Sequence, residues 1–218
     1  MIRAYCRLRK LTDPLFPLSH VPQLLITGFG SIDDPEGTII YEKTLEFMDE
    51  EEFADYERDM VVVPLPPSDQ LLNALLRSTK ICLQLSIREG FEIKATEALA
   101  KGIPVIAYRT GGLVNQVDDG KSGYLVDPGD YESVASLMQT LLTDTKLYND
   151  MSTFALQSFH KSLCTPFQAA NWFWLFNYVM EEDQNGSKNG EMNDTKLNTQ
   201  NQVAEAVQSR DVSLFWNH

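Results

Sequence analysis

Short, almost uninterrupted apolar runs alternate with segments of helical spacing along this 218-residue chain, and this alternation constrains its fold most strongly. A run of four or five apolar residues is typical of a strand that is buried on both faces, as in a parallel sheet. Such runs occur at residues 23–27, 60–64, 81–85, 104–107 and 123–126. Because helical patterns separate them, the sequence predicts an α/β fold with a doubly wound parallel sheet covered on both faces.

The helical patterns have recognisable ends. They lie at residues 2–11, 38–48, 69–78, 92–101, 131–142 and 144–159. Ser68 is placed to cap the start of the helix at 69–78, whereas Gly102 ends a helix and Pro104 begins the next strand. We therefore predict one Rossmann-like domain over residues 1–160.

The remainder of the chain divides into two parts by composition. We assign residues 161–182, which include the aromatic run 172–176, to a C-terminal aromatic helix. A helix that is aromatic on all sides either packs into a core or faces a partner. Residues 183–218 are mostly polar and too poor in apolar side chains to offset the entropy of ordering, so we predict a disordered tail.

The charge balance excludes some classes of partner. The chain has 18 Lys and Arg residues against 31 Asp and Glu residues, a net charge of −13 with a pI near 4.6. Nucleic acid and anionic membranes would repel such a chain, so we expect neither as a partner. Most of the excess of acidic over basic residues lies at residues 33–59. Basic and acidic residues are equal in number at residues 86–123, so this region could still bind an anionic ligand.

Cysteine usage and the amino terminus are typical of a protein of a reducing compartment. Cys6, Cys82 and Cys164 are far apart, so neither a disulfide framework nor a zinc site is indicated. The first residues lack the apolar core of a secretion signal, and the longest apolar-rich stretch, 172–180, is half a membrane span. We expect a cytoplasmic protein without metal or cofactor.

The densest signal for chemistry lies between the apolar run at 81–85 and the helix expected from residue 92. Loops at the carboxyl ends of parallel strands bind ligands, and amide groups at a helix start favour phosphate. Glu89 would stand at the mouth of this crevice, where its carboxylate could accept two sugar hydroxyls, and Gly90 would let a ligand approach the backbone. Glu97 would lie near the second helical turn, facing the same crevice. The alternative is that Glu89 and Glu92 only favour a helix N-terminus and that Glu97 is solvated.

Other candidate groups are given ordinary roles. Gly28-Phe29-Gly30 follows a strand but lacks the third glycine of a dinucleotide fingerprint, so it is interpreted as a turn that lines the crevice. His20 and His160 lie outside the crevice motifs and are interpreted as surface or packing residues.

The motifs around Glu89 resemble those of a known family. Ser86-x-x-Glu89-Gly90-Phe91, followed by Glu97, Gly102-x-Pro104 and Gly111-Gly112, resembles the E-x7-E region of glycosyltransferase family four, which has the two-domain GT-B fold. Residues 65–75 with 84–92 are similar to the branch that holds trehalose phosphorylases and trehalose-forming glycosyltransferases. The chain is thus identified as a carboxyl-terminal donor-binding domain of that family.

The resemblance implies retaining transfer of an α-glucosyl group. The expected ligands are a sugar phosphate or nucleotide-sugar donor, with glucose or trehalose. Glu89 would be the catalytic residue, and Glu97 would occupy the place that often binds the ribose of a nucleotide donor. The implied donor-binding residues are Ser86, Arg88, Gly90, Phe91, Glu97, Gly111 and Gly112.

The sequence departs from the family in two ways. The family carries phosphate-clamping Arg and Lys residues after the first strand of this domain, together with an amino-terminal acceptor domain. We find neither, so we expect a sheet that lacks its first strand, a chain that is a poor catalyst alone, and a homo-oligomer as a possible state because of the exposed sheet edge. Three readings stay open: a trehalose phosphorylase segment, a nucleotide-sugar glucosyltransferase, and a catalytically silent module that binds a sugar phosphate or a partner.

Overall fold

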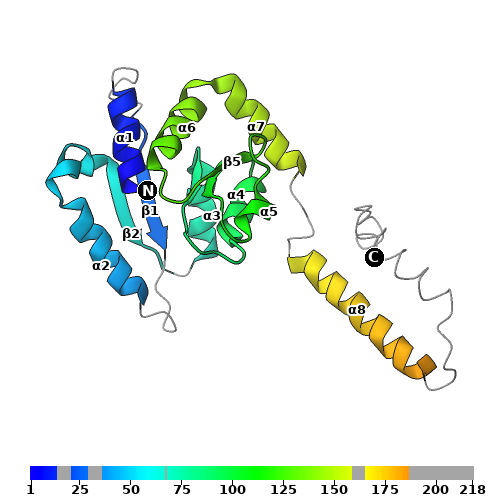
Figure 1. Ribbon diagram of the computed structural model, residues 1–218. Helices are drawn as coiled ribbons and strands as arrows, with labels where there is room; N and C mark the ends of the chain where they lie inside the picture. The colour runs from blue at the N-terminus through cyan, green and yellow to red at the C-terminus, as the bar shows by residue number, and fades with distance from the viewer. Residues whose placement is uncertain (14–20, 29–35, 67, 159–164, 187–218) are drawn as a thin grey trace. The chain divides into compact units, whose positions relative to one another are not determined.

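The computed structural model describes residues 1–13, 21–28, 36–66, 68–158 and 165–186 (Figure 1). The chain divides into two compact units, Met1–His160 and Lys161–His218. Strands and helices alternate in the first unit, as predicted. Their order is α1 (Ile2–Thr12), β1 (Leu24–Gly28), α2 (Glu36–Met48), the 3-10 helix η2 (Glu51–Asp59), β2 (Met60–Pro64), α3 (Asp69–Ser78), β3 (Cys82–Gln84), α4 (Ile93–Leu99), β4 (Val105–Tyr108), α5 (Leu113–Gln116), β5 (Gly123–Val126), α6 (Tyr131–Thr143) and α7 (Thr145–Ser158).

The strands are parallel, but they form two sheets rather than the single sheet that we predicted. β1 pairs with β2, with Leu24 opposite Met60, while β3, β4 and β5 form a second sheet in which Val105 lies opposite Cys82 and Gly123. In the doubly wound order 3-2-1-4-5-6, the first strand separates the second strand from the fourth. The described residues supply no strand for that position, which accounts for the division between β1 and β3.

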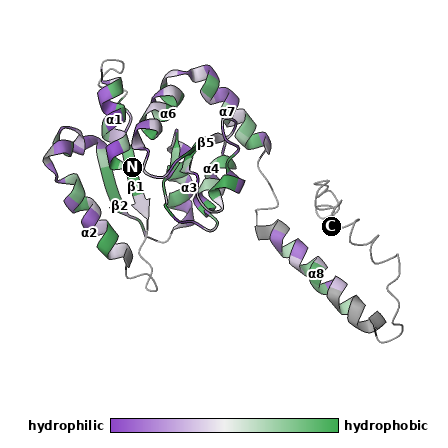
Figure 2. Ribbon diagram, in the orientation of Figure 1, coloured by the Kyte–Doolittle hydropathy of each residue, from purple (hydrophilic) through white to green (hydrophobic). Residues whose placement is uncertain are grey.

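Two clusters of buried side chains lie on opposite faces of β4. Ile106 belongs to a cluster that also contains Leu8 of α1 and Leu24 of β1. Its neighbour Val105 belongs to the other cluster, which includes Leu113 of α5. Because successive side chains of a strand point to opposite faces, β4 is buried on both faces, as its continuous apolar run predicted. Figure 2 shows green along much of β2 and both green and purple on the surrounding helices.

A buried arginine ties α1 to η2. The Arg9 side chain is only 9% exposed; it donates from Nε to Asp13 Oδ1 at 2.9 Å, pairs through Nη1 with Asp59, and lies over the Tyr56 ring at 5.2 Å. It also donates to the hydroxyl of Tyr5 at 3.3 Å. Burial alone would lower the pKa of Arg9, but the hydrogen bonds to Tyr5, Asp59 and Asp13 raise it above its ordinary value. The guanidinium therefore stays charged inside the fold.

Replacing Arg9 with methionine is expected to lower the free energy of unfolding by about 2–4 kcal/mol, because Asp59 would keep its charge without its buried partner. Urea unfolding measures the change. Arg3→Met on the same helix is the control: its ion pair with Glu52, at 3.7 Å, has both side chains more than half exposed and should contribute about 1 kcal/mol or less. Equal losses in the two variants would contradict the structural role given to Arg9.

The second unit contributes the helix α8 (Thr165–Gly186), which contains the aromatic run. Within α8, the rings of Trp174 and Tyr178 stack with centroids 5.4 Å apart. Trp172 and Phe173 are exposed within this unit, and the packing of the aromatic helix stays a prediction. Residues 183–186 belong to α8 rather than to the predicted tail, and the rest of that tail lies outside the described residues. No helix among the described residues is long and apolar enough to cross a membrane.

Candidate functional site

The loop between β3 and α4 carries most of the predicted site residues. β3 ends at Gln84, and α4 begins at Ile93 with Glu92 as its cap, accepting a hydrogen bond from Lys94 N at 2.9 Å. We call residues 85–92 the Glu89 loop. Glu89 is half-buried, whereas Arg88, Gly90 and Phe91 are exposed. The loop therefore leaves the carboxyl end of β3 with Glu89 partly accessible, as the sequence predicted.

The predicted glycines lie against the backbone of this loop. Gly112 N donates to Glu89 O at 3.2 Å. A Cβ atom added to Gly111, which has φ of +48°, would lie 1.6 Å from Glu89 O, and one added to Gly112 would lie 1.8 Å from Gly90 O. Side chains are therefore sterically excluded at both positions. Gly111 and Gly112 serve the site by letting the segment after β4 approach the Glu89 loop.

Two side chains of the segment after β4 hold the ends of the loop. Thr110 Oγ1 donates to Ser86 O at 3.0 Å. Ser86 therefore takes part in this contact through its backbone carbonyl group. At the other end, the amide of Gln116 accepts from Glu92 N at 3.0 Å and donates to Glu92 O at 2.8 Å. Our sequence analysis missed both Thr110 and Gln116. The sequence does hold one signal for Gln116: it lies three positions after Leu113, so both residues share one face of the short helix α5. A polar residue on that buried face indicates a hydrogen-bonding partner inside the fold.

The carboxyl group of Glu89 affects the ionisation of Glu92. Burial is the largest cause that raises the pKa of Glu92 above its ordinary value, and the charge and hydrogen bond of the neighbouring Glu89 carboxylate raise it further. The bond from Lys94 N opposes the shift. Glu89 itself accepts from Gly90 N at 3.1 Å through Oε1. The Glu92 carboxyl group is thus harder to ionise than that of an ordinary glutamate.

Glu97 is occupied on its own helix. Its Oε2 lies 3.1 Å from Lys94 Nζ, and its carbonyl accepts from Lys101 Nζ at 3.4 Å. Both members of the Glu97–Lys94 ion pair are about one-third exposed. Glu97 and Lys94 are therefore ion-pair partners on α4, and the role of Glu97 in donor binding stays a prediction.

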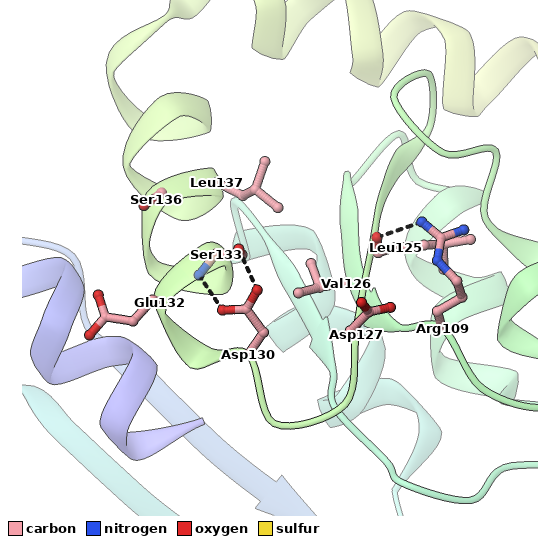
Figure 3. Close-up of a pocket in the computed structure, with 9 residues that line it drawn as sticks. All are labelled: Arg109, Leu125, Val126, Asp127, Asp130, Glu132, Ser133, Ser136 and Leu137. Atoms are coloured by element: carbon pink, nitrogen blue, oxygen red, sulfur yellow. Dashed lines mark hydrogen bonds between the residues drawn. The ribbon is translucent and has the colours of Figure 1, made fainter.

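A hollow of about 510 Å³ lies at the carboxyl ends of β4 and β5 (Figure 3). Sequence analysis did not predict it, and none of the predicted site residues lines it. Arg109 in its wall donates to Asp119 at 2.8 Å and to Leu125 O at 3.0 Å. Asp130 accepts from Ser133 N and Ser133 Oγ at the start of α6. These polar groups are already paired within the protein, so the hollow offers a ligand fewer contacts than its lining suggests.

The other residues that the sequence analysis singled out lie elsewhere in the fold or outside the described residues. Gly28 ends β1 and its carbonyl accepts from Leu65 N at 2.7 Å, while Phe29 and Gly30 lie outside the described residues. His20 and His160 also lie outside them. Cys6 and Cys82 are buried free thiols, and burial raises the pKa of Cys82 to about 11. Within the described part of the chain, no group of three His, Cys, Asp or Glu side chains is arranged to hold a metal ion.

Residues 17–158 match the family described as Glycosyl transferases group 1. The chain belongs to this family. The match includes the Glu89 loop, the Gly111-Gly112 pair and Gln116. It confirms the family resemblance that was based on the Glu89 motif.

Relatives of this glycosyl transferase chain are longer proteins. A trehalose phosphorylase of Pleurotus pulmonarius is 45% identical over 178 residues, which cover 80% of this chain and 24% of the relative. A trehalose synthase of Pyrococcus horikoshii is 42% identical over 104 residues, covering 48% of this chain and 24% of that protein. The chain thus spans about a quarter of the length of these relatives.

A solved structure supports the predicted fold class. The pneumococcal O-GlcNAc transferase GtfA, in complex with UDP and GlcNAc, has a TM-score of 0.59 at 19% identity. The match covers 82% of this chain and 32% of that one. At this identity the likeness shows the fold alone, and it confirms a Rossmann-like α/β domain of the GT-B type.

Proposed function

We propose that this chain forms the donor-binding part of a retaining α-glucosyltransferase of the trehalose phosphorylase type, which converts trehalose and phosphate to glucose and α-glucose 1-phosphate. The observation that carries the proposal is the Glu89 loop, held at the carboxyl end of β3 by the segment after β4. The identity of 45% to a trehalose phosphorylase over 80% of the chain supports the choice of substrate.

Glu89 is the group proposed to bind the glucosyl unit. A carboxylate accepts hydrogen bonds from two sugar hydroxyls, and such oriented contacts fix the anomeric carbon relative to its leaving group. The neighbouring Gly90 is exposed, and a Cβ atom there would meet nothing within 4 Å, so the backbone is open to a ligand. Glu89 thus offers the sugar a hydrogen-bond acceptor, and the backbone at Gly90 leaves space for the sugar beside it.

The described residues offer the departing phosphate fewer free hydrogen-bond donors than the sequence predicted. We expected amide groups at the start of α4 to hold it, but Lys94 N donates to the Glu92 side chain and Thr96 N to Glu92 O. Glu92 N is likewise engaged by Gln116. Because positive charge must meet the charge that develops on phosphate, we expect this chain alone to bind the glucosyl unit and to turn over slowly.

The test is a titration of this chain with α-glucose 1-phosphate, followed by the backbone amide NMR signals. We expect saturable shifts confined to residues 86–92 and 110–112, and a dissociation constant raised about 10-fold or more in Glu89→Gln. The control Glu132→Gln, in the hollow, should leave the shifts unchanged. No response of the Glu89 loop to α-glucose 1-phosphate would contradict the proposal.

A nucleotide-sugar glucosyltransferase is the second candidate function. The specific observation in its favour is the 42% identity to a trehalose synthase over 104 residues. The same titration with UDP-glucose separates the two, since a much tighter response to UDP-glucose than to α-glucose 1-phosphate would favour the synthase type. A chain that responds to neither ligand would favour the silent module that binds a partner.

A further inference from the structure

Gln116 is a buried polar residue that contacts the Glu89 loop but is not proposed to contact the sugar. It lies on α5, and only 8% of the residue is exposed. Glutamine is mostly found at protein surfaces, because a buried amide must replace the hydrogen bonds that water would supply. Its burial therefore requires a set of partners inside the fold.

The partners of Gln116 match an amide and no other side chain of its size. Oε1 accepts from Glu92 N at 3.0 Å, while Nε2 donates to Glu92 O at 2.8 Å and to Thr96 Oγ1 at 2.7 Å. A glutamate would lack the donors, and a methionine would lack both kinds of group. Gln116 thus bonds both peptide groups of one residue, which fixes the backbone of Glu92 in position and orientation.

The residue that Gln116 holds is the junction between the Glu89 loop and α4. Glu92 caps α4 through its side chain, and Glu89 lies three residues before it. The other contacts to the loop are made by Thr110 Oγ1 and Gly112 N, at Ser86 O and Glu89 O. These hydrogen bonds all involve residues 110–116, and Gln116 supplies the two at the end nearest the helix.

We propose that Gln116 is a positioning residue for this site, which holds the Glu89 loop in the conformation that receives the glucosyl unit. The inference rests on the proposed function for the identity of the ligand, but not for the effect on the loop. A loop fixed before binding loses less conformational entropy when the ligand arrives. Gln116 does this without touching the sugar.

The alternative is that Gln116 only stabilises the fold, as any satisfied buried residue does. The two roles differ in where they act. Loss of a stabilising residue speeds global opening, which affects the amides of the whole unit, whereas loss of a positioning residue speeds local opening of the Glu89 loop. Hydrogen exchange of single amides separates these two kinds of opening.

The experiment compares Gln116→Met, which keeps the length of the side chain without its hydrogen bonds, with Gln116→Glu in the full 218-residue chain. We expect the amides of Glu92 and Gly112 to exchange about 10-fold faster or more in Gln116→Met, and the dissociation constant for α-glucose 1-phosphate to rise by a similar factor. Gln116→Glu retains an acceptor for Glu92 N and should give intermediate values.

The control variant is Thr12→Val in α1. Thr12 is 1% exposed and donates one hydrogen bond to Leu8 O at 2.8 Å, so its loss also removes a buried hydrogen bond without altering the loop. In Thr12→Val, the ratio of the amide exchange rate of Glu92 to the exchange rates of the β4 amides should stay unchanged.

Two results would overturn the inference: a uniform rise of exchange over the whole unit in Gln116→Met, or faster loop exchange with unchanged affinity for α-glucose 1-phosphate. A wild-type chain that does not bind α-glucose 1-phosphate contradicts the proposed function instead. In that case the exchange data alone decide whether Gln116 positions the loop.

Discussion

Replacing Glu89 with alanine is expected to lower kcat/KM for the phosphorolysis of trehalose by about 30- to 1000-fold, which corresponds to about 2–4 kcal/mol of transition-state binding. The measurement uses a chimera in which this chain replaces the matching quarter of the Pleurotus pulmonarius trehalose phosphorylase. The groups that hold the Glu89 loop, on Thr110, Gly112 and Gln116, all belong to this chain. The geometry around Glu89 is therefore carried into the chimera intact.

The effect of Glu89 is separated from a general loss of acidic charge by Glu132→Ala. Glu132 lines the hollow at the carboxyl ends of β4 and β5 and pairs with Arg7 at 2.6 Å, with both side chains about half exposed. We expect its loss to change kcat/KM less than 3-fold, since exposed pairs contribute about 1 kcal/mol or less. A chimera that keeps full activity without Glu89 would disprove the role of Glu89. A wild-type chimera with no phosphorolysis would contradict the proposed substrate instead.

The elements of the fold were predictable where the signals are local. Continuous apolar runs located β1 to β5 because strands buried on both faces lose the polar alternation of a half-exposed strand. Turn and cap residues acted as expected: Ser68 accepts from Leu71 N at 3.3 Å, and Gly102 ends α4 with φ of +70°. These features depend on a few neighbouring residues, which a sequence displays directly.

Two features of the fold depended on information that the local pattern does not contain. The division into two sheets follows from strand order, which is a property of the whole topology. We did not predict η2 because acidic residues dominate its sequence. Phe53 and Tyr56, three positions apart, are its buried anchors, and that spacing is the period of a 3-10 helix.

The site was predictable as a segment but not as an assembly. The position of Glu89 after a buried strand follows from the α/β pattern, and the family motif points to the same residue. The partners of its loop are about 24 residues further along the chain, as in the bonds from Gln116 to Glu92 and from Thr110 to Ser86. Such contacts exist only once β3 and β4 lie side by side, so spacing along the sequence does not reveal them.

The segment after β4 also gives the largest expected effect on stability, through Gly111→Ala. A Cβ atom at Gly111 would lie 1.6 Å from Glu89 O, so the backbone of the Glu89 loop would have to move. The positive φ of Gly111 adds the strain of a left-handed alanine, about 1–2 kcal/mol, to an overpacking cost of about 1–3 kcal/mol. We expect the free energy of unfolding to fall by about 2–5 kcal/mol in urea titrations, and the Glu89 loop to lose its response to α-glucose 1-phosphate.

Gly120→Ala separates the two causes, because Gly120 also has a positive φ, +76°, but a Cβ atom there would meet nothing within 4 Å. Its substitution should cost only the strain of the backbone, about 1–2 kcal/mol, and should leave the response of the Glu89 loop unchanged. The difference between the two variants then measures the steric contact with Glu89 O. If Gly111→Ala and Gly120→Ala were equally stable and both bound α-glucose 1-phosphate like the wild type, the close approach of the two loops would not be needed for the site. A larger loss of both stability and binding in Gly111→Ala than in Gly120→Ala would show that Gly111 shapes the site through its close approach to the backbone of Glu89.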